Sequence, residues 1–395
     1  MTHLRHAATP PRVDALALAS RVEVVEAFLA MEVFERAVAL EQSGRSICHF
    51  EVGEPDFPAP EAAVEAARHA LAVADTRYSD SRGLLELREA IARDKQRRCG
   101  SPVDPEDVFV TPGTSPAMLL AFSCLVRPGD EVIVPAPHYP CYPNFIRFFG
   151  GIPVPVPCDP GDGFAIDPER IRRALTPRSR ALVLASPANP TGAIQSQAVY
   201  DELSHLGLPI VSDEIYDGLQ YDGEPGATAL GRGAPAFVLD GFSKRYAMTG
   251  FRLGYLIAPG EARRRLHVLA QNFLISVSSF VQRAGIAAIE SGEPTLRAMR
   301  AAYERRRGVL VDGLRDIGFD IPVLPRGAFY VLAGARRFDE DSRRLAFRLL
   351  DEAGVAATPG ADFGEYAEGS LRFCYAVADS TISMGLERLA RALAR

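Results

Sequence analysis

The chain has 395 residues, of which 47% are hydrophobic and 24% charged, and its formal net charge is −6. This length predicts two domains in a soluble globular protein, and the absence of a basic stripe argues against nucleic acid as a partner. The six cysteines are scattered without metal-ligand spacing, which argues against zinc and a disulfide framework. We expect no membrane span and no secretory signal, and therefore a cytoplasmic protein.

Apolar residues recur at helical spacing between residues 21 and 42, which predicts one N-terminal helix. Helical segments and short apolar runs then alternate. Helices are expected at 60–72, 83–97, 115–125, 168–175 and 197–206, and strands at 108–111, 131–135, 181–186, 210–213, 237–241 and 254–258. Buried strands that alternate with helices predict an α/β fold with a mostly parallel sheet and helices on both faces.

The pattern changes near residue 290. One long charged helix is expected at 294–316, followed by strands at 329–332 and 371–374 and helices at 342–352 and 380–395. We therefore predict three parts: an N-terminal arm and helix (1–50), a large domain (51–290) and a smaller α+β domain (291–395). The N-terminal helix is expected to pack with the small domain.

Only two of the 44 Lys and Arg residues are lysines, Lys95 and Lys244. Lys95 stands in a polar run that predicts a solvated helix face. Lys244 follows a short apolar run, and a lysine amine, unlike a guanidinium, can lose its proton and attack a carbonyl. A retained lysine here suggests imine chemistry, with pyridoxal phosphate as the expected aldehyde, although a chance surface lysine is the alternative.

Polar clusters follow four of the predicted strands, at the edge where ligands bind in open parallel sheets. The first, at residues 111–115, opens a helix and suits a phosphate, or is an ordinary N-cap. The second places Asn189 on a Pro/Gly turn. The third ends an apolar strand with Asp213, which needs a cationic or hydrogen-bonded partner such as a pyridine nitrogen, or caps a helix. The fourth is Ser243-Lys244, with Arg252 as a candidate phosphate ligand.

Three segments resemble the signatures of the class I/II aminotransferases, the fold-type I pyridoxal-phosphate enzymes of the aspartate aminotransferase superfamily. They are Asn-Pro-Thr-Gly at 189–192, Asp-Glu-Ile-Tyr at 213–216 and Ser-Lys-Arg-Tyr-Ala-Met-Thr-Gly-Phe-Arg-Leu-Gly-Tyr at 243–255. The similarity runs from about residue 32 to the C-terminus, and the last motif is highly specific.

The resemblance implies pyridoxal 5'-phosphate as cofactor and assigns the residues around its ring. Lys244 is expected to form the Schiff base and Asp213 to pair with the ring nitrogen. Asn189 and Tyr216 are expected to bind the ring hydroxyl, and Tyr139 to stack on the ring. Lys244, Asp213 and Tyr216 are thus the expected catalytic residues.

The resemblance also assigns the phosphate and the substrate. The phosphate is expected on Thr114, Ser115, Ser243 and Arg252. Tyr78 matches a tyrosine that reaches the phosphate of a neighbouring subunit, which implies a homodimer with shared sites. Arg372, with Gly53 and Asn189, is expected to bind the substrate α-carboxylate.

Some positions depart from the commonest family pattern. The chain has no tryptophan, and Phe251 stands where the signature often has one. No second arginine for a dicarboxylate side chain can be identified, which leaves specificity for aspartate in doubt. The side chain of the substrate is expected to contact residues 12–29, the surroundings of Tyr78 and the loop 358–364.

The predicted reaction moves an α-amino group from an L-amino acid to a 2-oxo acid such as 2-oxoglutarate or pyruvate, with ping-pong kinetics. A C–S β-lyase or an amino-acid oxidase on the same fold would use the same residues, so both stay open. A transcription regulator would need a DNA-binding module before the first motif, which we do not expect. A dinucleotide-like glycine pattern at 231–236 precedes its strand, which argues against a dehydrogenase.

Overall fold

The computed structural model describes residues 18–223 and 226–394. Its centre is a seven-stranded sheet with the order β2-β8-β7-β6-β5-β3-β4. Neighbouring strands are parallel except β8, which runs antiparallel to β2 and β7. The strands are β2 (Val108–Thr111), β3 (Glu131–Ala136), β4 (Ile152–Pro157), β5 (Ser179–Ala185), β6 (Ile210–Asp213), β7 (Ala236–Gly241) and β8 (Gly254–Ile257). The predicted α/β class with a mostly parallel sheet is confirmed.

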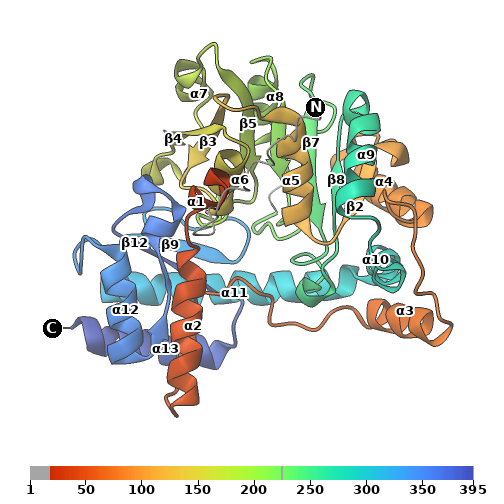
Figure 1. Cartoon of the computed structure of the whole chain (residues 1–395). Helices are drawn as coiled ribbons and strands as arrows, with labels where there is room; N and C mark the ends of the chain where they lie inside the picture. The colour runs from red at the N-terminus through yellow and green to blue at the C-terminus, as the bar shows by residue number, and fades with distance from the viewer. Residues whose placement is uncertain (1–17, 224–225, 395) are drawn as a thin grey trace, which may run out of the picture.

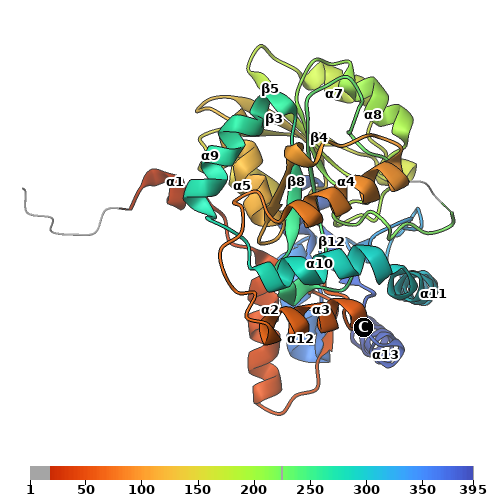
Figure 2. The ribbon, with the colours of Figure 1, turned by 90° about the vertical axis from the view of Figure 1, so that its right-hand side faces the viewer.

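Helices cover both faces of this sheet (Figure 1). The face that carries Val211 and Leu239, called the pocket face below, packs against α5 (Thr114–Leu125), α6 (Cys141–Phe148) and α9 (Arg263–Phe273). The face that carries Ile210 and Val238, called the back face, packs against α4 (Leu85–Cys99), α7 (Pro168–Ala174) and α8 (Gln197–Ser204). Helices α3 (Glu61–Ala72) and α10 (Ser279–Ser291) lie side by side beyond α4 in both views (Figure 2).

The C-terminal part of the chain forms its own layer beside the carboxyl ends of the sheet (Figure 1). Its antiparallel sheet has the order β11-β12-β9. The elements are α11 (Glu293–Ile317), β9 (Tyr330–Gly334), α12 (Ser342–Ala353), β10 (Val355–Ala356), β11 (Thr358–Pro359), β12 (Ser370–Cys374) and α13 (Asp379–Leu393). The short strand β1 (Cys48–His49) pairs with β10 in parallel, so the N-terminal segment joins this layer. Short 3-10 helices lie at Pro105–Asp107, Pro160–Asp162, Thr249–Phe251, Gly260–Ala262, Gly360–Phe363 and Glu365–Ala367.

The single helix predicted at 21–42 is wrong, because the structure has α1 (Ser20–Glu23) and α2 (Leu29–Gln42) with extended backbone at Phe28. The carboxylate of Asp362 accepts hydrogen bonds from the backbone N–H groups of Leu29 at 2.9 Å and Ala30 at 3.3 Å. These bonds satisfy donors that a helix start leaves free. Because Asp362 is 333 residues away from Leu29, the local pattern could not predict this helix start.

Strand β4, whose residues are Ile-Pro-Val-Pro-Val-Pro, is not predicted from the sequence. Proline cannot donate to the ladder of hydrogen bonds and is confined to sheet edges. Strand β4 is the edge strand beside β3, so its prolines can face away from the neighbouring strand. Helices α6, α9 and α10 were missed as well. No helix among the residues that the structure describes has the length and apolar character needed to cross a membrane.

The prediction that Lys95 lies on a solvated helix face is wrong. Its side chain is 0% exposed on α4, against the back face of the sheet. Its ammonium group lies 2.8 Å from a carboxylate oxygen of Glu214 and 2.7 Å from one of Asp240. A charged helix face can be buried when carboxylates on the opposite element pair with its cations.

Candidate active site

A cavity of about 240 Å³ lies between the carboxyl ends of the sheet strands and the C-terminal layer. It is the place where an open parallel sheet is expected to bind its ligand. Nine of the twelve residues predicted for the site line this cavity. They are Gly53, Thr114, Ser115, Tyr139, Asn189, Asp213, Tyr216, Lys244 and Arg372.

Lys244 follows β7, and its Nζ donates a hydrogen bond to the backbone oxygen of Gly53 at 2.6 Å. Burial lowers the pKa of the Lys244 ammonium to about 8, although Cys374 and Glu54 oppose the shift. An amine with this pKa is partly neutral near physiological pH and can act as a nucleophile. Glycine is required at position 53, because an added Cβ would lie 1.7 Å from Tyr330 Oη.

Asp213 is the last residue of β6, and its side chain enters the cavity from the pocket face. The hydroxyl of Tyr142 donates to its Oδ2 at 2.7 Å, and the N–H of Ile215 donates to its Oδ1 at 3.2 Å. Burial raises the pKa of Asp213 to about 6, and these two hydrogen bonds only partly offset the effect. Both donors are neutral, so a cationic ligand group would stabilise the ionised carboxylate.

Arg372, on β12, reaches the cavity from the C-terminal layer. Its Nη1 donates to Asn189 Oδ1 at 3.0 Å, and its Nη2 donates to Thr358 Oγ1 at 3.0 Å and to the backbone oxygen of Glu51. Its Nε is buried without a hydrogen-bond partner, and its guanidinium carbon lies 4.4 Å from the centre of the Tyr330 ring. All its acceptors are neutral, so the guanidinium group keeps its charge for a carboxylate ligand.

The start of α5 forms a cradle for an anion. Gly113 precedes the helix with a φ of +94°, and no side chain caps the N–H groups that follow. The guanidinium of Arg252 lies against this turn, since a Cβ added at Gly113 would be 2.6 Å from Arg252 Nη2. Free N–H groups at the start of a twelve-residue helix, together with an arginine, are typical of phosphate sites.

Comparison with known proteins assigns the family. The model of the family "Aminotransferase class I and II" matches residues 45–389. The chain is a class I and II aminotransferase. It is 41% identical over 387 residues to an aspartate/prephenate aminotransferase of Thermus thermophilus, with 96% of this chain and 99% of the relative covered. It is also 37% identical over 349 residues to an arginine–pyruvate transaminase of Pseudomonas aeruginosa, with coverages of 87% and 89%.

Solved structures agree with this assignment. The aspartate aminotransferase of Thermus thermophilus with maleate superimposes with a TM-score of 0.91 at 39% identity, covering 96% of this chain and all of that chain. The predicted enzyme class, transamination between amino acids and 2-oxo acids, is therefore confirmed. Members of this family use pyridoxal phosphate.

The cavity of this aminotransferase fits that cofactor. It offers a lysine amine with a lowered pKa, a buried carboxylate without a cationic partner and an uncapped helix start beside an arginine. These groups match an aldehyde, a pyridine nitrogen and a phosphate in turn. The ring of Tyr139 forms another wall, in edge contact with Tyr142 at a centroid distance of 5.5 Å.

Three predicted residues of the aminotransferase do not line the cavity. Ser243 is buried beside Lys244, and Arg252 lies against Gly113, the residue before Thr114. Tyr78 lies on the surface with 84% of its side chain exposed, as a residue that serves a neighbouring subunit would. Their expected roles stay predictions.

Two tyrosines were missed. Tyr142 binds Asp213, and the hydroxyl of Tyr330 lies 2.7 Å from that of Tyr216. Tyr142 stands three residues after Tyr139, so its closeness in sequence could have indicated that both line the same cavity. Tyr330 is 114 residues away from Tyr216, and the sequence carries no signal for that contact.

Proposed function

We propose that this aminotransferase binds pyridoxal 5'-phosphate in the cavity through Lys244. The decisive observation is that Lys244 and Asp213, from the ends of adjacent strands, line one cavity with Arg372. When bound, the cofactor supplies an aldehyde that condenses with amines and a ring that accepts electrons released at the substrate α-carbon.

The side chains around the ring have separate tasks. Asp213 would accept a hydrogen bond from the ring nitrogen, and Asn189 and Tyr216 would bind the ring hydroxyl. The amine of Lys244 would hold the aldehyde and would carry the proton that the substrate α-carbon loses. The lowered pKa of Lys244 favours the neutral amine that this proton transfer needs.

The phosphate and substrate contacts complete the site. Residues Thr114, Ser115, Ser243 and Arg252 hold the phosphate at the start of α5. Arg372 binds the α-carboxylate of the amino acid as a bidentate partner, with Gly53 and Asn189 beside it. This grip orients the bond between the α-carbon and its hydrogen toward Lys244.

We propose an amino acid with an apolar or aromatic side chain as the amino donor. Phe28, Met31, Met118 and Ile215 line the cavity, and the cations among its described lining residues are Lys244 and Arg372. Both cations already have tasks, so the described residues that line the cavity include no arginine for a second carboxylate. Arg283 pairs with Asp75 and Glu86 and does not line the cavity.

We propose a homodimer with shared sites. An open groove lined by Phe57, Phe251 and Phe280 lies next to Arg252, and Phe273 and Ile275 are exposed on the same stretch of chain. A second copy would cover these apolar side chains and bring Tyr78 of the partner subunit to the phosphate. We also propose the division into parts 1–50, 51–290 and 291–395, since α10 ends at Ser291 and α11 begins at Glu293.

Replacement of Lys244 tests the proposal. The purified enzyme is given phenylalanine or aspartate with 2-oxoglutarate, and the 2-oxo acid product and the visible absorbance of the bound cofactor are measured. Lys244→Ala is expected to lose at least about 10²–10⁴-fold in rate, together with the absorbance band. Lys244→Arg is the matched control, because it keeps the charge and cannot form an imine.

Three outcomes would contradict the proposal. Retained rate and absorbance in Lys244→Ala would remove its catalytic role. Faster turnover of aspartate than of phenylalanine would overturn the substrate class. Release of pyruvate and ammonia from cystathionine, or oxygen uptake, in place of transamination would point to a β-lyase or an oxidase.

A further inference from the structure

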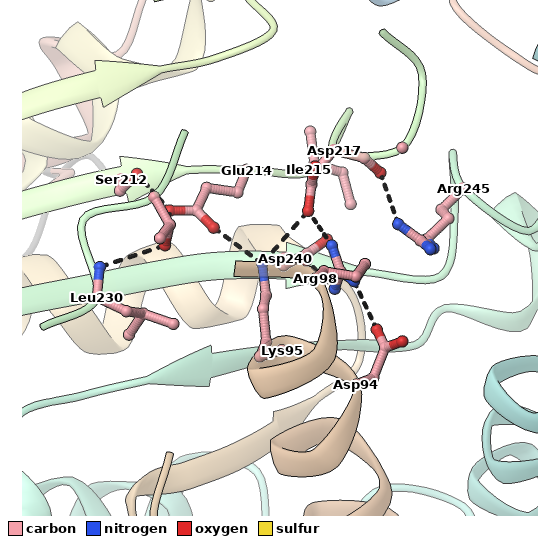
Figure 3. Close-up of polar contacts among 12 residues, drawn as sticks. Asp94, Lys95, Arg98, Ser212, Glu214, Ile215, Asp217, Leu230, Asp240 and Arg245 are labelled. Carbon is pink, nitrogen blue, oxygen red and sulfur yellow. Dashed lines mark hydrogen bonds and ion pairs between the residues drawn. The ribbon is translucent and has the colours of Figure 1, made fainter. Parts of the chain in front are cut away.

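A cluster of buried charges lies on the back face of the sheet, where Lys95 of helix α4 meets Glu214 and Asp240 (Figure 3). The ammonium of Lys95 lies 2.8 Å from Glu214 Oε2, 2.7 Å from Asp240 Oδ2 and 4.0 Å from Asp217 Oδ2. Lys95, Glu214 and Asp240 all have fully buried side chains. Burying three charges is costly even when they are paired, because the desolvation penalty can exceed the Coulombic gain. The arrangement therefore needs an explanation beyond packing.

Each carboxylate of the cluster is held on several sides. Glu214 Oε1 accepts hydrogen bonds from Ser212 Oγ at 3.0 Å, from Thr228 Oγ1 at 2.9 Å and from the N–H of Ala229 at 3.2 Å. Asp240 Oδ2 accepts from Tyr255 Oη at 2.8 Å. Both carboxylates are therefore fixed in place, and their contacts with helix α4 are made through Lys95 and, for Asp240, also through Arg98.

A second cation, Arg98, stands one helical turn after Lys95 on α4. Its Nε donates to Asp94 Oδ2 at 2.7 Å, and its Nη2 lies 3.4 Å from Asp240 Oδ2. It also pairs with Asp217. Lys95 thus lies at the centre of the cluster, between Glu214 and Asp240. Arg98 pairs mainly with the outer acids Asp94 and Asp217.

Strand geometry connects this cluster to the cofactor site. Successive side chains of a strand point to opposite faces, so Asp213 enters the cavity while Glu214 points to the back face. Asp240 follows Leu239, which pairs with Asp213 on the neighbouring strand. Two negative charges therefore stand immediately behind Asp213, on the side away from the cofactor.

The charges act on Asp213 through the sheet. Burial raises the pKa of Asp213, and Asp240 and Glu214 raise it further. Burial alone would lower the pKa of Lys95, but Asp240 and Glu214 outweigh it and raise the pKa above its ordinary value. Burial raises the pKa of Asp240, but Lys95 and then Arg98 bring it below its usual range. Lys95 thus stays charged at neutral pH and compensates the two acids behind Asp213.

Other titratable groups lie beside Asp213 and beside the charge cluster, and they could also change the local charge. Three of them face Asp213 from the loop before α6 and from α6: Tyr139, Cys141 and Tyr142. Two more face the cluster from α8 and β8, namely Tyr200 and Tyr255. Burial raises the pKa of each of these side chains, so they stay neutral near pH 7. The acids and the two cations of α4 therefore set the local charge.

We propose that Lys95 is a positioning residue of this enzyme, which neutralises Glu214 and Asp240 from the back face and so keeps Asp213 ionised toward the cofactor ring nitrogen. The inference rests on the proposed function, in which Asp213 pairs with that nitrogen. Asp213 lies between the cluster and the ring, so excess negative charge behind it draws the shared proton from the nitrogen onto Asp213. A protonated Asp213 no longer holds the ring cationic.

The retained lysine follows from this role. The ammonium occupies the space between two carboxylates, each within 3 Å, as a compact point charge. A guanidinium group is larger and planar, and it pairs through a fork of donors. The chain uses arginine for almost all its other cations. Its two lysines both belong to the proposed cofactor site, where Lys244 meets the aldehyde and Lys95 lies behind Asp213.

The affinities of two cofactors test the proposal. Pyridoxal phosphate and its 1-deaza analogue, in which carbon replaces the ring nitrogen, are titrated into cofactor-free wild type and Lys95→Met. The affinity for pyridoxal phosphate divided by the affinity for the 1-deaza analogue is the measured ratio. This ratio is expected to fall about tenfold in Lys95→Met, equivalent to one pKa unit at the Asp213 carboxylate. General loosening of the fold weakens both ligands and leaves this ratio unchanged. In the holoenzyme, ¹⁵N NMR of ring-labelled cofactor is expected to show loss of the proton from the nitrogen.

A double variant with the same net charge as wild type is the matched control for Lys95→Met. Lys95→Met with Glu214→Gln removes one charge of each sign, so the ratio and the ¹⁵N signal are expected to return toward wild type. An unchanged ratio in Lys95→Met, or a double variant that stays as impaired as the single, overturns the proposal. If Lys95→Met does not fold, Glu214→Gln alone decides: the proposal requires a higher ratio, and an unchanged or lower ratio overturns it.

The same titrations separate this inference from the proposed function. If wild type binds the two cofactors equally, or if Asp213→Asn leaves the ratio at its wild-type value, Asp213 does not pair with the ring nitrogen and the proposed function fails there. If wild type and Asp213→Asn differ as expected while Lys95→Met equals wild type, only the role of Lys95 fails.

Discussion

The two lysines of the chain occupy opposite faces of the same sheet edge, and their environments push them in opposite directions. Burial lowers the pKa of Lys244 to about 8, and its hydrogen-bond acceptor is the neutral backbone oxygen of Gly53. Lys95 is more deeply buried, yet Glu214 and Asp240 hold its pKa above the ordinary value. Burial therefore does not decide whether a lysine is reactive; the carboxylates beside it do.

The arginines repeat the contrast. Arg98 on the back face pairs with Asp94, Asp217 and Asp240. Arg372 in the cavity donates only to neutral oxygens, and its Nε lacks a partner. The enzyme thus satisfies its charges on one face and leaves them for ligands on the other. Such incompletely satisfied sites cost stability, which is the usual trade-off at active sites.

The same substitution at the two lysines is expected to have opposite effects on the cofactor-free protein. Lys95→Met leaves buried carboxylates unpaired and should lower the free energy of unfolding by about 3–5 kcal/mol. Lys244→Met removes an ammonium that the folded state disfavours and should raise the free energy of unfolding by about 1–3 kcal/mol near pH 7. Denaturant unfolding measures both.

The pH dependence sharpens this test. The folded pKa of Lys244 is about 8, below its ordinary value of 10.5, so its cost to stability is complete below pH 8 and fades as the pH rises toward 10.5. The gain in Lys244→Met should therefore shrink over that window. A loss of stability at both lysines, of similar size, would show that packing rather than charge governs them.

Arg372→Lys tests the other half of the contrast through binding. The variant keeps the charge but loses the bidentate fork, so the KM for the amino acid should rise about 10–100-fold while kcat changes much less. Arg36→Lys is the matched control, because Arg36 pairs with Asp351 on the surface and should keep the wild-type KM. An unchanged KM in Arg372→Lys would place the substrate carboxylate elsewhere.

The pocket face was easier to predict from the sequence than the back face. Its residues stand in short motifs at strand ends, and the strands themselves are continuous apolar runs such as β6 and β7. The role of Lys95 could not be predicted, because its partner Glu214 is 119 residues away and a polar helix run is usually solvated. Strand β4 was hidden by prolines that only an edge position tolerates.

Asp213→Asn should also stabilise the cofactor-free protein, by about 1–3 kcal/mol above pH 6. The folded pKa of about 6 exceeds the ordinary value of 3.8, so the ionised carboxylate costs stability above pH 6, and this cost fades between pH 6 and 4. Asparagine keeps an oxygen for the hydroxyl of Tyr142. Thermal unfolding of wild type and Asp213→Asn across this pH range measures the gain in stability. Cofactor affinity, measured in parallel, shows whether binding is lost in exchange. A variant that is less stable than wild type at pH 8 would contradict it.

The smallest effect is expected at His49, a third cation set between carboxylates. Its Nδ1 lies 2.7 Å from Glu51 Oε1 and its Nε2 lies 3.2 Å from Glu41 Oε1. The hydrogen bond to Glu51 is the main cause that raises the pKa of His49 to about 9, against the opposing effect of burial. The protonated ring therefore stabilises the fold fully below pH 6.5, and this contribution is lost as the pH rises to 9.

His49→Gln should accordingly lose about 1 kcal/mol at pH 6, because the partly exposed ring is screened by solvent, and almost nothing at pH 9.5. Free energies of unfolding at the two pH values, compared with wild type, measure the difference. A loss of equal size at both would mean that the ring acts by packing against Phe34, whose centroid is 6.3 Å away, rather than by its charge. In that event, neighbouring carboxylates would govern the charge of a buried cation only where both partners are fully buried, as at Lys95.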